Sequence, residues 1–524
     1  MRSEVARLLQ EAAQDRGDRP AVIEGRTGAT LSWSALGQAA EAWAHRLEAA
    51  ALPPGTAVGL LAEHPLAFIP AYLGLLAAGA VVLPLDPSAP SAGGQSEAAS
   101  ALAEFQVAVL VTDTETGHGA ASVAGIPAWQ SAWGAAAAAL GDASAGPLPP
   151  RSARPAVWVE PASVVLRTSG TTGRPKGVPL HEAQLLHGAR AVAGHHGFQP
   201  GERVYSSLPL FHINAQVTGL MAAVVSGTTL VVDGRFHRQE FWDVLDSWEV
   251  GVLNAVPAIL ALLADGSPPP EAVTRRIRFA RSASAPLPLA TLTAFEALTG
   301  IGVLETYGMT EAAGQICANP LCAAERRPGT VGRGVGIEVR VADDVGAGAA
   351  PEVPGGVQIR GPSVTPAYAI PDPAGGMASR RPAVDREGWL TTGDVGSLDA
   401  GGFLTLLGRT DGVINRGGEK LYPREVEEVL RRHAGVAEVA VVGEPDPVLG
   451  ERPVAFVVPR VPGGSDQRLH DELVALCAGA LGRHKRPARI QVTERLPATP
   501  TGKVRRDQLK AMVVAAAAGE GTLP

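Results

Sequence analysis

Short apolar runs alternate along the chain with segments long enough to form a helix. Several of these runs are rich in β-branched residues and predict buried strands, at 58–61, 81–83, 107–111, 163–167, 228–232 and 303–305. Parallel neighbours in a sheet need a crossover element between them, usually a helix. The alternation therefore predicts an α/β fold in which helices cover largely parallel sheets.

The longest uncharged run covers residues 67–85, close to the length that a membrane-spanning helix requires. Four helix-breaking residues interrupt it: Pro70, Gly74, Gly79 and Pro84. We therefore predict a buried helix at 71–78 followed by a buried strand at 80–83. Residues 1–20 carry acids among their apolar positions, which predicts an amphipathic helix and not a signal peptide.

The remaining segments predict loops, short strands and a second domain. Residues 91–155 have Ala-rich, Gly-rich and Pro-rich parts, which predict a helix and a surface loop. Between 326 and 369 strand-like runs alternate with glycine turns and predict a small β-rich subdomain. Near the end, Pro423 marks the first turn of a helix, and 436–442 and 454–458 predict paired strands. This last portion has the size of a compact α+β domain, about 110 residues.

Composition narrows the class of protein. At 524 residues the chain exceeds what one hydrophobic core usually spans, so at least two domains are expected. Its net charge of −7 gives no chain-wide electrostatic reason to expect nucleic acid binding. Cys317, Cys322 and Cys477 are too few for a disulfide framework, and no further Cys or His lies near Cys317 and Cys322 to complete a metal site. The expected compartment is the reducing cytoplasm.

The strongest chemical signal is RTSGTTGRPKGVPL at 167–180, directly after a strand-like run. Glycines and hydroxyl side chains in a short loop offer many donors to an anion, and Lys176 adds a cation, which suits a polyphosphate. The segment is not a Walker A loop, because Pro175 precedes Lys176 and Gly177 follows it. The loop residues expected to contact phosphate are Thr168, Ser169, Gly170, Thr171, Thr172 and Gly173.

This loop resembles the phosphate-binding signature of the adenylate-forming superfamily, which includes acyl-CoA synthetases, aryl-CoA ligases, firefly luciferase and peptide-synthetase adenylation domains. Five further motifs follow in the family's order: SLPLFHINAQ at 207–216, ETYGMTEA at 305–312, GWLTTGD at 388–394, GRTDGVINRGGEKLYPREVE at 408–427 and LPATPTGKVRR at 496–506. The resemblance spans nearly the whole chain. It implies an α/β N-terminal domain, a small mobile α+β C-terminal domain, and activation of a carboxylic acid by ATP with Mg²⁺, followed by transfer to coenzyme A.

The resemblance also implies catalytic roles for four side chains. Glu311 would hold Mg²⁺, and Thr310 and Lys176 would contact phosphate oxygens. Lys503 would meet the charge that develops between the carboxylate and the α-phosphate. Because two anions must come together in this reaction, the site has to supply positive charge and hold the groups in line.

Other side chains are expected to bind the nucleoside. Tyr307 would lie against the adenine. Asp394, assisted by Arg409, would accept hydrogen bonds from the ribose hydroxyls. The remaining residues expected to line the nucleotide are Ser284, Ala285, Pro286, Thr306, Gly308 and Met309.

Two half-reactions in one site imply a domain movement. Adenylation needs Lys503 in place, whereas thioester formation needs it withdrawn and a thiol admitted. By resemblance, the C-terminal domain rotates about Asp411. The expected domains are therefore 1–408 and 412–524, with a hinge near 409–412.

A passage for the thiol of coenzyme A is expected just after this hinge. Gly417 and Gly418 lack side chains, so their backbone can line a narrow tunnel for pantetheine. Lys420 would contribute to the same tunnel.

Phe211, His212, Asn214 and Ala215 are expected to line the acyl pocket. His212 stands where peptide-synthetase adenylation domains carry an Asp that binds the substrate ammonium, so an amino acid is not the expected substrate. The segments GRFHRQEFW and RFARSASAPL look most similar to the oxalyl-CoA synthetase-like branch. The pocket departs from that branch, because Asn214 replaces a second histidine and Pro286 replaces a serine.

A dicarboxylate such as oxalate would need a second cationic or donor group in the pocket. Small residues leave room for a bulkier acid: Ala215, Ala283, Ser284 and Ala285. We therefore predict a bulky, mostly apolar monocarboxylic acid. The high Ala and Gly usage is typical of GC-rich bacterial genomes, whose ligases often serve natural-product or lipid pathways.

Two other interpretations stay open. A stand-alone adenylating enzyme that loads a carrier protein would share the first half-reaction. A non-catalytic nucleotide-binding relative is disfavoured, because Lys503, Glu311 and Asp394 are all present. The expected partners are the acid, ATP and CoA, with a carrier protein as a further option and neither nucleic acid nor a membrane.

Overall fold

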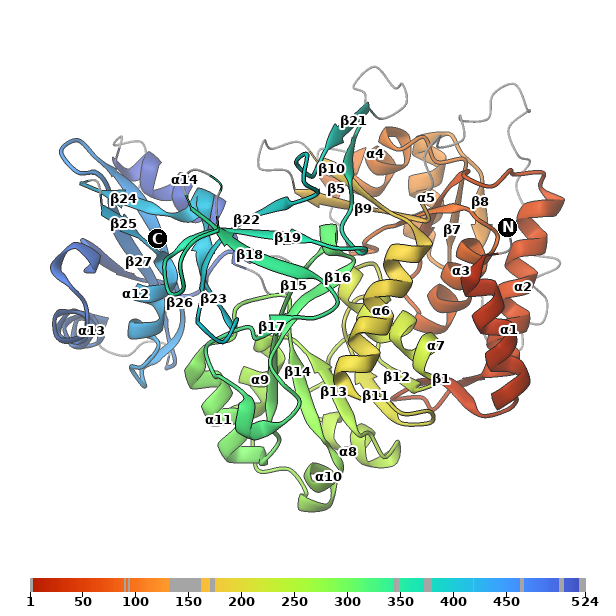
Figure 1. Cartoon of the computed structure of the whole chain (residues 1–524), viewed down its shortest axis with the longest axis horizontal. Helices are drawn as coiled ribbons and strands as arrows, with labels where there is room; N and C mark the ends of the chain where they lie inside the picture. The colour runs from red at the N-terminus through yellow and green to blue at the C-terminus, as the bar shows by residue number, and fades with distance from the viewer. Residues whose placement is uncertain are drawn as a thin grey trace.

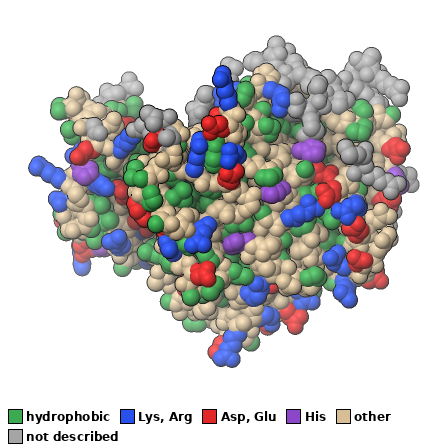
Figure 2. Space-filling view, viewed as in Figure 1, with side chains coloured by type: hydrophobic (Ala, Val, Ile, Leu, Met, Phe, Trp, Pro, Cys, Tyr) green, Lys and Arg blue, Asp and Glu red, His purple; other side chains and the backbone are tan. Residues whose placement is uncertain are grey.

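The computed structural model describes residues 3–88, 91–92, 95–131, 162–169, 175–343, 346, 348–371, 379–417, 419–461, 466–498 and 504–517 (Figure 1). In this view the C-terminal residues (blue) form a lobe at the left. Helices α1 (Glu4–Arg16) and α2 (Trp33–Ala49), in red, lie at the opposite end. Acidic and basic side chains are interspersed over the face that Figure 2 shows.

One large sheet includes the strand that carries the start of the ETYGMTEA motif. Its strands follow the order β17 (Arg333–Gly334), β16 (Gly314–Ala318), β15 (Val303–Met309), β14 (Phe279–Ser282), β13 (Val252–Ala255), β11 (Arg203–Ser206), β12 (Thr229–Val232), β1 (Pro20–Glu24) and β2 (Thr30–Ser32). From β15 to β1 each neighbouring pair is parallel. The predicted strands 228–232 and 303–305 are confirmed. The carboxyl ends of β13, β14 and β15 share one edge, where open α/β sheets bind ligands.

A second large sheet carries the predicted phosphate loop. Its strands follow the order β21 (Ser379–Pro382), β20 (Ala367–Ile370), β10 (Pro175–Leu180), β9 (Val164–Ser169), β4 (Val81–Pro84), β3 (Ala57–Leu61), β7 (Val109–Thr112) and β8 (Ala128–Gln130). From β9 to β8 the pairs are parallel, and β9 pairs antiparallel with β10. These strands confirm the predictions at 58–61, 81–83, 107–111 and 163–167.

Helices cover these sheets (Figure 1). Besides α1 and α2 they are α3 (Pro65–Ala77), α4 (Glu97–Glu104), α5 (Glu115–Ala124), α6 (Glu182–His196), the π-helix η3 (Asn214–Met221), α7 (Ala222–Ser226), α8 (Phe241–Ser247), α9 (Pro257–Ala264), α10 (Glu271–Arg276) and α11 (Leu289–Thr299). The segment 91–155 holds more regular structure than predicted, since α4, α5, β8 and the short pair β5 (Ser91–Ala92) and β6 (Gln95–Ser96) lie within it. Residues 132–155 lie outside the described ranges.

Helix α3 is longer than the predicted 71–78. Pro70 lies inside it, so the predicted start after Pro70 is wrong, whereas the predicted order of a buried helix followed by a buried strand is confirmed by β4. Every residue from Pro65 to Leu76 is buried, and this tertiary packing offsets the missing N–H of Pro70. No helix in the described ranges has both the length and the apolar character that crossing a bilayer requires.

A smaller antiparallel sheet has the order β18 (Glu338–Ala342), β19 (Gly355–Arg360), β22 (Leu390–Leu398) and β23 (Leu404–Arg409). The β-rich subdomain predicted at 326–369 is therefore only partly correct. Within that stretch, β17 and the start of β20 belong to the two large sheets. The pattern of turns did not reveal this, because strand partners are set by contacts distant in sequence.

The chain then enters a separate C-terminal sheet. Its strands are β25 (Glu419–Leu421), β24 (Ile414–Arg416), β27 (Gly450–Pro459) and β26 (Val436–Asp446), with β28 (Arg489–Val492) beside β27, and its helices are α12 (Pro423–Leu430), α13 (Asp466–Ala480) and α14 (Arg506–Ala517). The helix at Pro423 and the pairing of 436–442 with 454–458 are confirmed. So is the predicted fold class, an α/β N-terminal part followed by a small α+β domain. The limits 1–408 and 412–524 stay a prediction.

Gly74 allows α3 to approach α2 closely. A Cβ at this position would lie 2.5 Å from both the Ala40 carbonyl oxygen and the Trp43 Cβ. We expect Gly74→Ala to lower the free energy of unfolding by about 1–3 kcal/mol, because overpacking outweighs the better helix propensity of alanine. Gly119→Ala in α5 is the matched control, since nothing lies within 4 Å of its Cβ. Equal stability of the two variants in thermal and urea denaturation would contradict this packing argument.

Candidate active site

Lys176 of the glycine-rich segment forms an ion pair with Glu311. Its Nζ lies 3.2 Å from Glu311 Oε1 and 3.5 Å from the ring centroid of Tyr368. The Tyr368 hydroxyl donates to the same Glu311 oxygen at 3.3 Å. Burial, with the nearby Glu311 charge, raises the pKa of Tyr368 above its usual range, so this hydroxyl keeps its proton. Segments far apart in sequence thus bring a cation, an anion and a hydroxyl donor to one point.

The predicted phosphate loop begins beside this pair. Thr168 faces Lys176 across the β9–β10 ladder, and its Oγ1 is buried without a hydrogen-bond partner among the described residues. A buried hydroxyl left unpaired fits a site that bonds an external oxygen. Ser169 ends β9. The next loop residues, Gly170, Thr171, Thr172 and Gly173, lie outside the described residues.

Glu311 is the residue expected to hold Mg²⁺, and it is 7% exposed. In the described part of the chain no group of three or more His, Cys, Asp or Glu residues could hold a metal. Magnesium commonly binds through one or two carboxylates plus substrate phosphates. A lone carboxylate beside a phosphate loop fits an ion that arrives with the nucleotide.

The β15–β16 hairpin positions the rest of the ETYGMTEA motif. Thr306 Oγ1 donates to the last carbonyl group of β14 at 2.9 Å, which ties the ends of the two strands together. At Gly308 a Cβ would lie 2.2 Å from the Gly314 oxygen, so a side chain does not fit there. The 3-10 turn η4 (Thr310–Ala312) follows Met309 and carries the ion-paired carboxylate.

Tyr307, Asp394 and Arg409 meet between the first large sheet and the antiparallel sheet. The Tyr307 hydroxyl donates to Asp394 Oδ2. Arg409 faces Asp394 across the β22–β23 ladder, and its Nη1 lies 3.5 Å from Asp394 Oδ1. Burial, reinforced by the Asp394 charge, raises the pKa of Tyr307 well above its usual range. The structure therefore brings together the side chains expected at the adenine and the ribose.

The expected acyl-pocket residues come from two neighbouring segments. The rings of Phe211 and His212 are 4.4 Å apart, and Asn214 begins the π-helix η3, a feature frequent at functional sites. Asn214 Nδ2 donates to Ser284 Oγ at 3.1 Å, and Ala215 is buried. Ala285 and Pro286 follow Ser284 in the loop after β14.

Sequence reasoning missed Arg281, which lies in β14 just before this loop. Its Nη1 donates to Asn214 Oδ1 at 3.0 Å and to Asn254 Oδ1 at 2.9 Å. Its Nε donates to Gln315 Oε1 at 3.3 Å. The signal was present in RFARSASAPL, where an arginine interrupts a largely apolar strand. Arg281 is therefore a cation hydrogen-bonded to Asn214, one of the residues expected to line the acyl pocket.

Comparison with known families identifies the chain. The model of the AMP-binding enzyme family matches residues 9–369, and that of the AMP-binding enzyme C-terminal domain matches residues 425–503. The first match covers more than half of the chain. The chain belongs to the AMP-binding enzyme family. The resemblance to adenylate-forming enzymes is thus confirmed.

Characterised relatives of this AMP-binding enzyme are CoA ligases. Sulfoacetate–CoA ligase of Cupriavidus necator is 35% identical over 96% of this chain and 97% of that protein. Oxalate–CoA ligase of Arabidopsis thaliana is 35% identical over 66% of this chain and 66% of its own length. These relatives confirm the expected class of enzyme, an AMP-forming acid–thiol ligase.

Solved structures agree with this assignment. MatB from Rhodopseudomonas palustris with bound ATP has a TM-score of 0.84 at 25% identity, over 98% of this chain and 99% of that one. The o-succinylbenzoate CoA synthetase of Bacillus subtilis with its acyl-adenylate has a TM-score of 0.80 at 28% identity, over 96% and 97% of the two chains. Structures of the latter enzyme also contain ATP with magnesium, in line with the expected cofactors.

The expected hinge and tunnel residues of the AMP-binding enzyme lie where the C-terminal sheet begins. Asp411 sits in the 3-10 turn η6 (Thr410–Gly412) between β23 and β24, and its side chain is 62% exposed. Gly417 has φ +63° in the turn between β24 and β25, and Lys420 is exposed on β25. Gly418 and Lys503 lie outside the described residues. The hinge and tunnel roles stay predictions.

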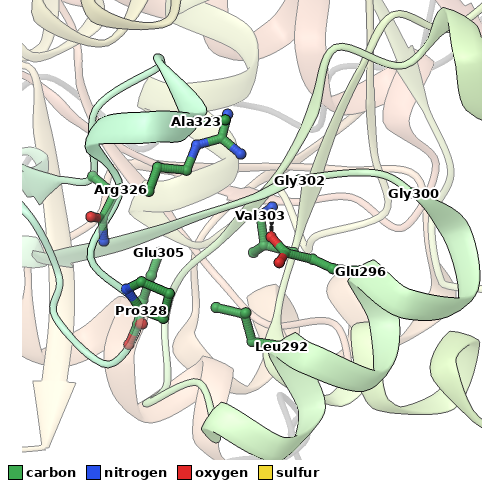
Figure 3. Close-up of a pocket in the computed structure, with 10 residues that line it drawn as sticks. Leu292, Glu296, Gly300, Gly302, Val303, Glu305, Ala323, Arg326 and Pro328 are labelled. Atoms are coloured by element: carbon green, nitrogen blue, oxygen red, sulfur yellow. Dashed lines mark hydrogen bonds between the residues drawn. The ribbon is translucent and has the colours of Figure 1, made fainter.

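A separate cleft of about 240 Å³ lies beside the start of β15 (Figure 3). In Figure 3 Glu296 accepts a hydrogen bond from the Val303 backbone, at 2.7 Å. The full lining is Leu292, Glu296, Gly300, Gly302, Val303, Glu305, Asn319, Ala323, Arg326 and Pro328. None of the site residues predicted from the sequence lines this cleft, although Glu305 is the first residue of the ETYGMTEA motif.

Glu305, at the edge of this cleft, is a buried carboxylate. It is 3% exposed, and neither oxygen has a hydrogen-bond partner among the described residues. Arg424 of α12 places Nη2 at 3.7 Å from Glu305 Oε1 and donates from Nη1 to the Leu406 carbonyl at 3.0 Å. Burial raises the pKa of Glu305 to about 7, and the Arg424 charge opposes that shift. The contact links the C-terminal domain to β15.

We expect Glu305→Gln to stabilise the protein at pH 8 but not at pH 5. The folded protein holds a proton on Glu305 up to about pH 7, whereas the unfolded chain releases it near the ordinary pKa of 4.5. The stability of the natural protein should therefore fall as pH rises between these values. The variant should gain about 3 kcal/mol at pH 8. Denaturation at both pH values measures this, with the exposed Glu271→Gln as control; a pH-independent difference would contradict the assignment.

Proposed function

We propose that this AMP-binding enzyme is an ATP-dependent acyl-CoA synthetase that works in two half-reactions at one site. In the first, a carboxylate oxygen attacks the α-phosphorus of ATP, the bond to pyrophosphate breaks, and an acyl adenylate forms. In the second, the thiol sulfur of CoA attacks the acyl carbon, its proton passes to solvent, and AMP leaves. The observation that carries this proposal is the meeting of Lys176, Thr168 and Glu311 at the phosphate loop.

Charge is the main difficulty in the first half-reaction. A carboxylate is a poor electrophile because its leaving group would be oxide, and it must approach a second anion, the triphosphate. Lys176 supplies a fixed cation there, and Glu311 and Thr310 supply oxygen ligands beside it. Mg²⁺ bound with the triphosphate would neutralise further charge on the phosphate oxygens. Lys503 is proposed to face the reacting carboxylate.

The nucleoside is proposed to bind at the Tyr307–Asp394 contact. Asp394 has oxygens that accept hydrogen bonds, as two ribose hydroxyls require. Arg409 Nη1 lies 3.5 Å from Asp394 Oδ1 and the Tyr307 hydroxyl donates to Asp394 Oδ2, so both neighbours orient this carboxylate. Tyr307 also offers an aromatic ring at the position expected for the adenine.

The second half-reaction is proposed to follow a rotation about Asp411. This residue lies in the turn at which the chain leaves one sheet for another, so a change of its dihedral angles would reorient the whole C-terminal domain. The rotation would withdraw Lys503 and bring the backbone of Gly417 and Gly418 to the thiol. The partner in this step is proposed to be CoA.

The acid is only partly defined by this comparison. Small side chains at Ala215, Ala283 and Ala285 leave room in the pocket, as the sequence suggests. The relatives named above are named for sulfoacetate, oxalate and o-succinylbenzoate, each of which carries two acidic groups. The expectation of an apolar monocarboxylic acid rested on the absence of a second cationic or donor group from the pocket, and the hydrogen bond from Arg281 to Asn214 supports the presence of such a group.

A broad panel of carboxylic acids tests the proposed function. We expect pyrophosphate release and ATP–pyrophosphate exchange with at least one acid, and a thioester of matching mass when CoA is added. Thioester with a phosphopantetheinyl carrier protein but not with CoA would reassign the acceptor. Exchange at background level with every acid, in a protein that still denatures cooperatively, would refute the proposal.

Two variants should separate the half-reactions. Lys503→Ala should lower adenylation about 10²–10³-fold while leaving thiolysis of preformed adenylate largely intact, because only the first step needs its charge. Gly418→Leu should lower thioester formation while leaving adenylation largely intact, because a side chain would block the tunnel. Single-turnover kinetics measure each step. Equal losses in both steps for either variant would contradict the role assigned to that residue.

A further inference from the structure

Arg281 is a buried cation without an anionic partner among the described residues. Its side chain is 3% exposed, and burial is the only influence that shifts its pKa. Neutral amide oxygens of Asn214, Asn254 and Gln315 accept its hydrogen bonds at 2.9–3.3 Å. These oxygens orient the guanidinium but do not neutralise it.

An uncompensated buried charge is costly, and an apolar side chain of similar volume usually avoids that cost. Burial lowers the pKa of Arg281 to about 9, so the side chain is still charged at neutral pH. Burial, with the Arg281 charge adding to it, also lowers the pKa of His196 well below its usual range. The region is therefore positive, and an anion entering it would be stabilised.

The guanidinium lies at the expected acyl pocket. Asn214 accepts from Arg281 through its oxygen and donates to Ser284 through its nitrogen, so one amide connects the cation to the pocket wall. Asn254 is the register partner of Arg281 at the carboxyl ends of β13 and β14. Gln315 follows the hairpin turn that carries the ion-paired carboxylate. The second terminal nitrogen, Nη2, makes no hydrogen bond to a described residue.

We propose that Arg281 binds a second anionic group, a carboxylate or a sulfonate, on the acid that this site activates. The assignment rests on the proposed function, since it concerns the same pocket. A guanidinium donates paired hydrogen bonds to such a group. One carboxylate of the substrate would attack the α-phosphorus while the other anionic group stays on Arg281.

This arrangement selects against acids with uncharged tails. An apolar tail would displace water from the pocket and leave the guanidinium buried without a counter-ion, whereas an acid with a second anion pairs with it. Sites built to pair a polar substrate group reject analogues that lack it far more strongly than size alone allows. The amide oxygens of Asn214, Asn254 and Gln315 hold the guanidinium in place before the acid binds. Acid binding therefore costs little side-chain conformational entropy at Arg281.

The first test uses the natural full-length protein and matched acids. Pyrophosphate release is measured with oxalate, malonate, succinate, glutarate and sulfoacetate, with the monomethyl ester of each dicarboxylate, and with hexanoate and benzoate. Each ester keeps the reactive carboxylate and removes the second charge. We expect kcat/KM for the best dicarboxylate to exceed that of its ester at least about 100-fold, mainly through KM. Equal or higher values for the esters and apolar acids would overturn the proposal.

The second test removes the charge. Arg281→Met should lower kcat/KM for the best dicarboxylate about 100-fold, spare its monomethyl ester, and leave KM for ATP unchanged. Arg281→Lys should retain part of the preference. Arg278→Met is the matched control, because Arg278 is an exposed arginine paired with Glu202 three residues before Arg281. If kcat/KM fell equally for the dicarboxylate and its ester, or if KM for ATP rose with every acid, Arg281 would not be the residue that binds the acid.

The two proposals fail in different ways. No adenylate with any acid contradicts the proposed function. Adenylation of acids without preference for a second anion contradicts only the assignment of Arg281. If Arg281→Met does not denature cooperatively, the ratio of kcat/KM for the dicarboxylate to kcat/KM for its ester in the natural protein still tests the assignment of Arg281.

Discussion

The ion pair between Lys176 and Glu311 is the contact on which the arrangement of the site depends. Lys176 lies on β10 of one large sheet and Glu311 follows β15 of the other, so their 3.2 Å contact joins the two sheets. Both charges are largely removed from water, where either alone would be costly. A magnesium–triphosphate complex offers each member a partner of opposite sign. In the proposed function, substrate binding would therefore exchange one set of paired charges for another without leaving either charge alone.

The sequence predicts those parts of the fold in which the local pattern of apolar residues already matches their burial in the folded protein. Strands β3, β4 and β12 are buried in parallel ladders, so their apolar runs are visible without knowledge of their neighbours. Helix α3 is different, because burial against other helices overrides the helix-breaking tendency of Pro70 and Gly74. Likewise β20 joins the second large sheet through a partner almost two hundred residues earlier, as the pairing of Gly177 with Ala369 shows.

The candidate site also has residues that the sequence predicts and residues that it does not. Glu311, Asp394 and Arg409 lie in motifs whose residue types match phosphate, magnesium and ribose chemistry, so the sequence predicts them. Tyr368 lies outside such motifs, and Arg281 lies in the segment RFARSASAPL, whose residue types alone do not indicate what the arginine contacts. The surroundings of Arg281 are drawn from three separate segments, through Asn214, Asn254 and Gln315. No spacing along the chain could indicate that three amide oxygens would converge on one guanidinium.

The adjacent strands β14 and β15 each carry a buried ionisable side chain, Arg281 and Glu305, and only one of the two can become neutral at neutral pH. Glu305 on β15 can shed its charge by taking up a proton, since burial raises its pKa to about 7. Arg281 on β14 cannot do this at neutral pH, because burial lowers its pKa only to about 9. The carboxylate is therefore compatible with a protein-only environment, whereas the guanidinium keeps a standing requirement for an anion. That asymmetry supports the proposal that a charged part of the substrate binds beside Arg281 and not in the cleft beside Glu305.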